Sequence, residues 1–366
     1  MPQLDSLRAL AIAAVVQHHW RINAPEIPLV SGVHLFFVLS GFLITGILLD
    51  ARERNGAGGS AALRYTLRGF YARRFLRIFP LYYVALAVAI YFDVAGVRHT
   101  WAWHATYLSN YHIFLKNDWI GLVGHFWTLA VEEQFYLVWP VVILCLPTAW
   151  LLRAFLVVAA GSVLFRFIGA VWFPRFVMWN VTTPGYLDCF ALGALVAHQH
   201  RAPGVMYSTF VRLRWPIIVA CWALTVLRRR TPADLHLVFL DPLFLAVAYA
   251  SVVSLAADRV RGPLGWILDR PGLQYLGKIS YGLYVIHNFA PIPIQAFLRR
   301  FPGLLVIPRV NVLLMGVWTL ALAMLSWHLF EAKINALKKH FPYSPRSRRE
   351  EQDRPADLAA VVRPEP

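Results

Sequence analysis

The sequence predicts an all-α, polytopic integral membrane protein with about ten transmembrane helices. Hydrophobic residues make up 58% of its 366 residues and charged residues only 15%, whereas a soluble domain is about 45–50% apolar and about 25% charged. The mean hydropathy is +0.54. Apolar segments of roughly 17–25 residues, the length that crosses a bilayer as a helix, recur along the whole chain. The predicted spans cover residues 4–20, 29–49, 78–95, 127–146, 151–172, 184–200, 215–228, 236–257, 275–298 and 310–331.

The basic residues predict how these spans are oriented. The net charge is +16, and 24 of the 35 Lys and Arg residues fall in cytoplasmic segments if the N-terminus is cytoplasmic. This is the distribution that the positive-inside rule describes, and an even number of spans then places both termini in the cytoplasm. Because the arginines cluster between apolar spans, we expect a lipid bilayer and no nucleic acid as partner. The oligomeric state stays open.

The segments outside the spans are predicted to be few. A basic loop at 50–77 is expected inside and an aromatic loop at 96–126 outside. Residues 342–366 are rich in proline and charge and are expected to be a disordered cytoplasmic tail after a transmembrane domain at 1–341. The three cysteines lie within apolar spans and form no disulfide framework. No metal-ligating motif or signal peptide is recognised, so no metal is expected.

The first span carries charge at both ends, because Arg8 and His19 flank an apolar run. Eleven residues at 100° each bring the two side chains within about 20° of one face, and they lie about 16 Å apart along the axis. Polar groups in a membrane span usually face the interior of a bundle or an aqueous path. The alternative is an interfacial anchor, with Arg8 extending to the headgroups and His18, His19 and Trp20 forming a belt.

The chain resembles the acyltransferase-3 family of polytopic membrane enzymes, which O-acylate carbohydrates and glycosylated natural products. The resemblance rests on Arg8 and His19, which match a basic residue, ten intervening residues and a histidine. Further similar blocks follow in order: GVHLFFVLSGFLIT at 32–45, YARRFLRIFPLYY at 71–83, HFWTLAVEEQFYLVWP at 125–140, YLDCFALGALVA at 186–197 and ISYGLYVIH at 279–287. His34 departs from the family, in which many relatives have Asp, and so does His18, which is often aromatic.

The resemblance implies transfer of an acyl group, usually acetyl, from cytoplasmic acyl-CoA to a sugar hydroxyl in a bacterial cytoplasmic membrane. His19 is the candidate general base, since the unperturbed pKa of histidine is about 6.5. Arg74 and Arg77, three residues apart on one helical face, are candidates for binding the phosphates of CoA, with Arg8 at the cytoplasmic mouth. An ordinary positive-inside cluster is the alternative for these arginines.

Glu132 and Glu133 begin the fourth predicted span at a depth comparable to that of His19. One of them is expected to orient the His19 imidazole, as the acid of a catalytic triad does, or to bind the acceptor hydroxyls. Because adjacent positions on a helix diverge by about 100°, both are not expected to face one cavity.

Other polar and aromatic side chains are expected to line the cavity or to serve packing. For Ser40, beside Gly41, close helix packing is the main interpretation, with oxyanion donation or cavity lining as the alternative. Asp188 and Arg166 are expected to form a structural ion pair. The remaining candidates for the substrate cavity are His34, Trp127, Tyr136, Ser280, Tyr281, Tyr284 and His287.

The alternative function is a secondary transporter or flippase, in which the intramembrane His, Glu and Arg residues form a path for protons or substrate. Transporters often contain two matched halves with broken helices, and no matched halves are recognised here. A catalytically inactive scaffold is disfavoured by the intact Arg8, His19 and glutamate block. The acceptor, the acyl chain length and a separate partner chain stay open.

Overall fold

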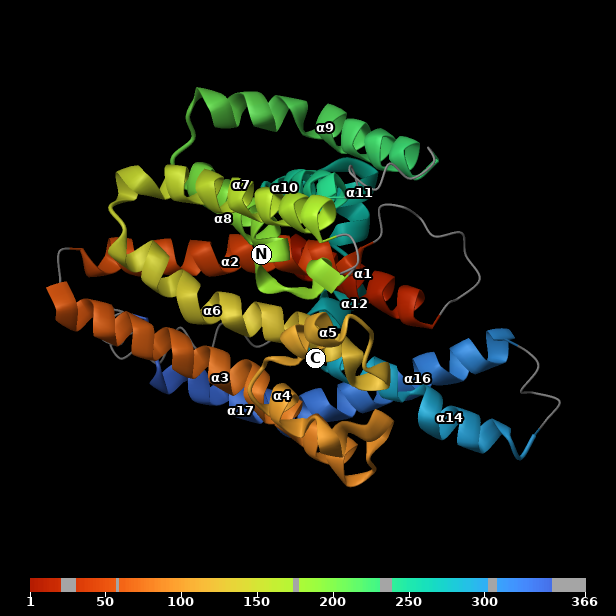
Figure 1. Cartoon of the computed structure of the whole chain (residues 1–366). Coiled ribbons are helices and arrows are strands. Elements are labelled where there is room, and N and C mark those ends of the chain that lie inside the picture. Colours follow the sequence, from red (N-terminus) through yellow and green to blue (C-terminus); the bar gives the residue numbers. More distant parts are fainter. Residues whose placement is uncertain (21–30, 57–58, 174–177, 231–238, 302–307, 344–366) are drawn as a thin grey trace.

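The computed structural model describes residues 1–20, 31–56, 59–173, 178–230, 239–301 and 308–343, and every described element is a helix. Figure 1 shows the long helices lying side by side in one bundle. The all-α prediction is therefore confirmed. Nearly all of the predicted tail lies outside the described residues.

The first half of the chain contains the helices that carry most of the predicted site. The long ones are α1 (Pro2–His19), α2 (Gly32–Asn55), α3 (Gly59–Tyr91), α6 (Trp127–Cys145) and α7 (Thr148–Trp172). The segment between α3 and α6, predicted as an aromatic loop, consists of short helices. These are η1 (Val94–His99), α4 (Trp101–Ala105), α5 (Ser109–Lys116) and η2 (Gly121–Phe126).

The second half alternates long helices with short ones. After η3 (Met178–Val181) and η4 (Thr183–Tyr186) come α8 (Leu187–Arg201), α9 (Val205–Arg230), α10 (Asp241–Ala257) and α11 (Gly262–Leu268). The remaining elements are α12 (Pro271–Lys278), α13 (Ser280–Ile286), η6 (His287–Phe289), α14 (Pro291–Leu298), α16 (Pro308–Ser326), the π-helical turn η7 (Trp327–Glu331), α17 (Ala332–Ala336) and η8 (Leu337–His340).

Six of the described helices are long and apolar enough to cross a membrane, or seven if α10 and α11, bent by 83°, form one span. These helices identify the chain as an integral membrane protein. The predicted count of ten spans is not confirmed. The predicted span at 184–200 is a helix of only 15 residues. The one at 275–298 is broken into α12, α13, η6 and α14. Pro291 lies in the first turn of α14, where its missing N–H costs no helix hydrogen bond.

The expected basic loop at 50–77 is wrong, because α2 continues to Asn55 and α3 already begins at Gly59. Leu, Ala, Arg and aromatic residues fill this segment, and the first proline inside α3 is Pro80. Such residues permit helix formation once packing supports it. As a result, Arg74 and Arg77 lie in the middle of a helix of 33 residues and not just before a span.

The core of the bundle is the crossing of α2 and α8. A Cβ at Gly41 would lie 2.1 Å from the backbone oxygen of Phe190, and one at Gly193 would lie 2.1 Å from the backbone oxygen of Val38. The two helices approach closely only because these positions have no side chain, as in small-residue packing of membrane helices. Phe37 and Phe190 stack beside the crossing with ring centroids 4.8 Å apart.

A buried ion pair joins α7 to α8 beside this crossing. Arg166 donates to Asp188 at 2.6 Å, and both side chains are almost fully buried. The guanidinium also donates to the backbone oxygens of Gly185 and Phe239 and to Ser162. The predicted pair is confirmed, and because every partner lies outside the cavities described below, its role is structural.

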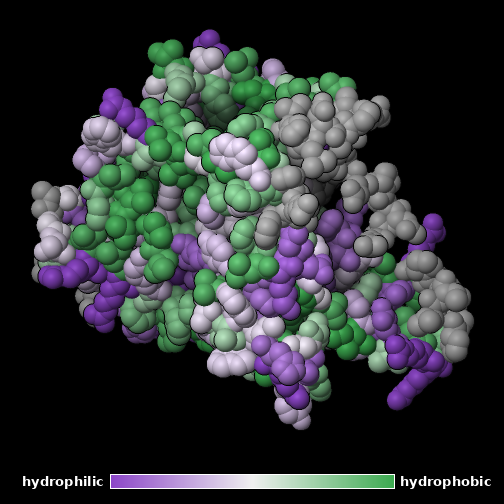
Figure 2. Space-filling view, in the orientation of Figure 1, coloured by the Kyte–Doolittle hydropathy of each residue, from purple (hydrophilic) through white to green (hydrophobic). Residues whose placement is uncertain are grey.

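The outer surface of the bundle matches a lipid environment. In α7, α9 and the long helix that begins with α16, only 17–22% of the most apolar segment is buried, whereas 72% of it is buried in α2. Figure 2 shows apolar side chains over much of the upper and left part of the visible face, and polar ones at its left edge, in its lower centre and at its lower right. Burying apolar surface against lipid and leaving the polar ends in water is the arrangement expected for membrane helices.

The α2–α8 crossing generates a prediction about stability. Gly193→Ala should destabilise the protein by about 1–3 kcal/mol, because the new methyl group overlaps the backbone of Val38 and forces the helices apart. Gly161→Ala on α7 is the matched control, since nothing lies within 4 Å of its Cβ position. The measurement is the thermal unfolding midpoint of the purified protein in detergent. Equal midpoints for the two variants would contradict a tight crossing.

Candidate active site

Three imidazoles meet at the end of the bundle where α1 finishes. His19 is the last residue of α1, His287 begins η6 and His125 lies in η2 just before α6. The ring centroid of His287 lies 5.0 Å from that of His19 and 5.1 Å from that of His125. His19 is exposed, whereas the other two are buried. The cluster therefore has one imidazole that a reactant can reach from this end.

The hydrogen bonds of His287 define the tautomers of the His19–His287 pair. Nδ1 of His287 lies 2.6 Å from the backbone oxygen of Tyr284, which can only accept, so this nitrogen carries the proton. Nε2 of a neutral His287 is then an acceptor, and it lies 3.0 Å from Nδ1 of His19. Nδ1 of His19 must donate this bond, which leaves the lone pair on its Nε2 free to take a proton.

Neither glutamate orients His19, as had been expected for Glu132 or Glu133. Among the described residues, the His19 imidazole contacts His287 and the backbone of Val15, and Glu132 accepts a hydrogen bond of 2.6 Å from Ser40 instead. The reason is depth. Glu132 lies five residues after the start of α6 at Trp127, about 8 Å down the axis, whereas His125 precedes α6 and reaches the histidine cluster.

A central cavity of about 110 Å³ lies between this cluster and the basic end of the bundle. Val33 and Ser40, which both line it, are seven residues apart on α2, so the cavity extends about 10 Å along that helix. Nine of the predicted site residues line it, from five different helices: Arg8, Ser40, Arg74, Arg77, Glu132, Tyr136, Ser280, Tyr281 and Tyr284.

The outer end of the central cavity approaches the histidines through Tyr284. The ring of Tyr284 lies 5.6 Å from that of His287, centroid to centroid. Its hydroxyl donates to the backbone oxygen of His125 at 2.7 Å and also contacts the hydroxyl of Thr128. One tyrosine and one histidine thus separate the cavity from His19.

The inner end of the central cavity contains three arginines with different partners. Arg8 pairs with Asp5 at 2.9 Å. Arg77 donates to the backbone oxygen of Lys278 at 3.1 Å and lies over the ring of Trp327. Arg74 lies between the rings of Phe70 and Tyr136, and its buried Nε has no hydrogen-bond partner in the described part of the chain.

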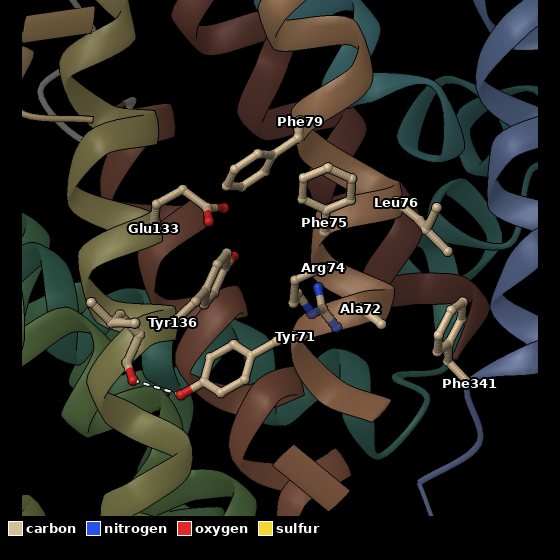
Figure 3. A pocket seen from close by; sticks show the side chains of 10 residues that line it. Tyr71, Ala72, Arg74, Phe75, Leu76, Phe79, Glu133, Tyr136 and Phe341 are labelled. Carbon is tan, nitrogen blue, oxygen red and sulfur yellow. Dashed lines mark hydrogen bonds between the residues drawn. The ribbon is translucent and has the colours of Figure 1, made fainter. Parts of the chain in front are cut away.

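The two glutamates face different spaces, as predicted from their angular separation. Glu132 lines the central cavity, with Arg8 and Arg74 within electrostatic reach of its carboxylate. Glu133 lines a second pocket, of about 520 Å³, between α3 and α6. Figure 3 shows Glu133 and Tyr136 on α6 across this pocket from Arg74, Phe75 and Phe79 on α3. Arg74 and Tyr136 line both spaces.

Two of the residues expected to line the cavity pack in the aromatic core. The ring of His34 lies against Tyr186 with centroids 5.1 Å apart, and its Nδ1 contacts the Ser31 hydroxyl at 2.5 Å. Trp127 packs between Tyr186 and Phe37. Both side chains thus contact Tyr186, the last residue of η4. Neither His34 nor Trp127 is among the residues that line the central cavity, and a role for them in binding substrate stays a prediction.

Two residues of the site were missed from the sequence. His125 was the first residue of the quoted block at 125–140 but received no role. Glu331 lies in η7 with its carboxylate buried, accepts from Ser326 at 3.0 Å and acts electrostatically on Arg77. The sequence could have predicted a paired role for Glu331, because an acidic residue at the end of an apolar span rarely lacks a partner.

Comparison with known proteins identifies the family. The sequence profile described as "Acyltransferase domain" matches residues 1–328. The chain therefore belongs to the acyltransferase-3 family, and the resemblance drawn from its motifs is confirmed. No solved structure matches the chain.

Curated relatives share part of their length with this chain. It is 36% identical over 158 residues to the peptidoglycan O-acetyltransferase OatA of Listeria monocytogenes, a match that covers 39% of this chain and 24% of the relative. The putative peptidoglycan O-acetyltransferase YrhL of Bacillus subtilis is 35% identical over 154 residues, covering 38% and 23%. An uncharacterized protein of Haemophilus influenzae is 35% identical over 124 residues, covering 30% and 47%. The matched region thus spans a quarter to a half of these relatives.

The separation of the two glutamates predicts unequal effects of substitution. Glu132→Gln should lower acetyl transfer by at least tenfold, because the carboxylate that lies among Ser40, Arg8 and Arg74 becomes neutral. Glu133→Gln, which changes the neighbouring pocket, should lower it by less than threefold. Transfer of radiolabel from acetyl-CoA in isolated membranes is the measurement, with protein amount normalised by immunoblot. A larger loss in the Glu133 variant would refute the assignment.

Proposed function

We propose that this protein is a membrane-embedded O-acyltransferase that moves an acetyl group from cytoplasmic acetyl-CoA to a hydroxyl of a carbohydrate acceptor. The proposal places the N- and C-terminal ends on the cytoplasmic side of a bacterial cytoplasmic membrane and treats residues 1–341 as one transmembrane domain. The observation that carries it is the central cavity, which has arginines at one end and the His19–His287 pair beyond the other.

His19 is the proposed general base. Its free Nε2 takes the proton of the acceptor hydroxyl as the oxygen attacks the thioester carbonyl, and the carbon–sulfur bond then breaks to release the CoA thiolate. The proton on the imidazolium passes to that sulfur, so the histidine returns to its starting state. His287 positions the base, because its Nε2 holds Nδ1–H of His19 and so keeps the lone pair on the reacting nitrogen.

Acetyl-CoA suits the basic end of the central cavity. Guanidinium groups bind phosphate oxygens in pairs, and the inner end of the cavity presents Arg8, Arg74 and Arg77. Of these, Arg74 is best placed to bind the donor, since its Nε lacks a partner among the described residues. The distance of about 16 Å between Arg8 and His19 is of the order that an extended pantetheine arm can span.

The end of the bundle at His19 supports a carbohydrate as the acceptor. His19 is exposed there, and the segment between α3 and α6 presents the exposed rings of Trp101 and Trp119. Aromatic faces pack against the apolar faces of sugars, and two relatives are named as peptidoglycan O-acetyltransferases, one of them putative. We therefore propose a polysaccharide or another glycan reached from outside the cell. The transporter alternative has no comparable support, because the chain belongs to an acyltransferase family.

The proposed base is tested by replacing it next to a matched control. His19→Ala should reduce acetyl transfer by about 10²–10⁴-fold, the usual contribution of a general base. His18→Ala should retain most activity, because the neighbouring imidazole is exposed and contacts neither His287 nor the central cavity. Membranes with each variant receive radiolabelled acetyl-CoA, and label is followed into glycan. Activity of His19→Ala at the level of His18→Ala would eliminate the proposed mechanism.

The positioning role of His287 predicts a graded series. His287→Leu removes the acceptor for Nδ1–H of His19, so kcat should fall at least tenfold while KM for acetyl-CoA stays within twofold. His287→Gln offers an amide oxygen as acceptor and should recover part of kcat. Equal rates for the two variants would show that His287 contributes packing alone.

A further inference from the structure

The last described residues, Leu337–Tyr343, fold back along α3. Nη1 of Arg73 donates to the backbone oxygens of Lys338 at 2.9 Å and Phe341 at 3.3 Å. Thr66 and Asn55 donate to the backbone oxygen of Tyr343 at 3.1 and 3.4 Å. All four bonds use main-chain acceptors of this segment. These bonds fix the backbone of Leu337–Tyr343 against α3 and use none of the segment's own polar side chains.

This path brings Lys338 to the arginines of the central cavity. The side chain is half-buried, and the positive charges of Arg8, Arg73, Arg74 and Arg77 act on its ammonium. Three of those arginines line the inner end of the central cavity. Figure 3 shows Phe341, from the same segment, at the rim of the neighbouring pocket that Arg74 also lines. Lys338 thus lies near the arginine end of the central cavity, which the proposed topology assigns to the cytoplasmic side.

The charge of Lys338 is not compensated within the described part of the chain. Arg8 has Asp5, Arg77 has Glu331 and Arg74 has Glu132 within reach. The ammonium of Lys338 has no hydrogen-bond or ion-pair partner among the described residues. Like charges in a partly buried place repel one another more than they do in water. The fold therefore holds a cation where a bound anion would be stabilised.

We propose that Lys338 is a phosphate-binding residue of the donor site and, with Arg74, binds the nucleotide phosphates of acetyl-CoA. This inference rests on the proposed function and names a contact for its donor. CoA has phosphates at two places on its nucleotide, so it calls for more than one cation. An ammonium binds phosphate as a point charge without strict geometry and complements the bidentate guanidinium.

This assignment comes from the fold and not from the family. The family match ends at residue 328, ten residues before Lys338. The sequence alone predicts for Lys338 only a place among the basic residues on the cytoplasmic side. The contact requires η8 to lie against α3, far away in the chain, and the hydrogen bonds of Arg73 provide this.

The experiment measures equilibrium binding of radiolabelled acetyl-CoA to the full chain in nanodiscs of neutral lipid. Lys338→Gln should raise the Kd about tenfold, the effect of losing one charge-assisted hydrogen bond. Lys338→Arg should stay within threefold of wild type. Lys339→Gln is the matched control, since the neighbouring lysine is exposed, and it should bind as wild type does. The inhibition constant Ki of acetyl-pantetheine, which lacks the nucleotide, should be the same for all variants.

Each of the other possible results would overturn a specific part of the proposal. If wild type fails to bind acetyl-CoA, the proposed donor is wrong and Lys338 loses its ligand. If wild type binds and Lys338→Gln binds equally well, the donor stands and the Lys338 assignment falls. A higher Ki of acetyl-pantetheine for Lys338→Gln than for wild type would show that Lys338 has a structural role and would overturn the proposed phosphate contact. An effect that emerges only when phosphatidylglycerol is added would assign Lys338 to a lipid headgroup.

Discussion

The hydrogen bond between the imidazoles of His19 and His287 is the interaction on which the site depends. It joins the end of α1 to the turn after α13, and a second bond from His287 to the backbone of Tyr284 defines its direction. Because a backbone oxygen can only accept, the proton positions along this chain of groups follow when both imidazoles are neutral. His19, the proposed base, is thereby exposed and paired with a residue 268 positions away in the chain.

The rest of the bundle serves to hold the two ends of the central cavity apart. The glycine-lined crossing of α2 and α8 and the Arg166–Asp188 pair form a rigid side of the bundle. Ser40, the neighbour of Gly41 on α2, donates to Glu132 in the cavity. On the other side, α3 carries Arg74 and Arg77 at the cavity, and its residues Thr66 and Arg73 hold the segment Leu337–Tyr343. Phe37 belongs to both parts, since it packs at the crossing and lines the cavity.

Much of this arrangement could be predicted from the sequence, because it depends on local periodicity and on motifs. Composition predicted a helical membrane bundle, the Arg8–His19 spacing placed one residue at each end of the site, and the step between Glu132 and Glu133 predicted their divergence. The Arg166–Asp188 pair followed from the cost of burying a lone charge.

What could not be predicted depends on contacts between distant helices. A carboxylate partner for His19 was reasonable by analogy, but depth along α6 places His125 and not Glu132 near the histidines. His34 and Trp127 looked like cavity residues because they occur in motif blocks, and a block does not tell which face of its helix is buried in the core. The break at Pro291 and the helical character of 59–77 likewise reflect packing that a hydropathy pattern does not contain.

The central claim is that one site is reached from two sides of a membrane, by the donor at the arginines and by the acceptor at His19. Sidedness tests this most directly. Acetyl-CoA, which does not cross bilayers, is supplied to sealed inside-out and right-side-out vesicles with glycan acceptor present on the periplasmic side. The account predicts label in glycan only when acetyl-CoA faces the cytoplasmic surface, with His19→Ala vesicles as background. Equal incorporation from the opposite surface in sealed vesicles would contradict it.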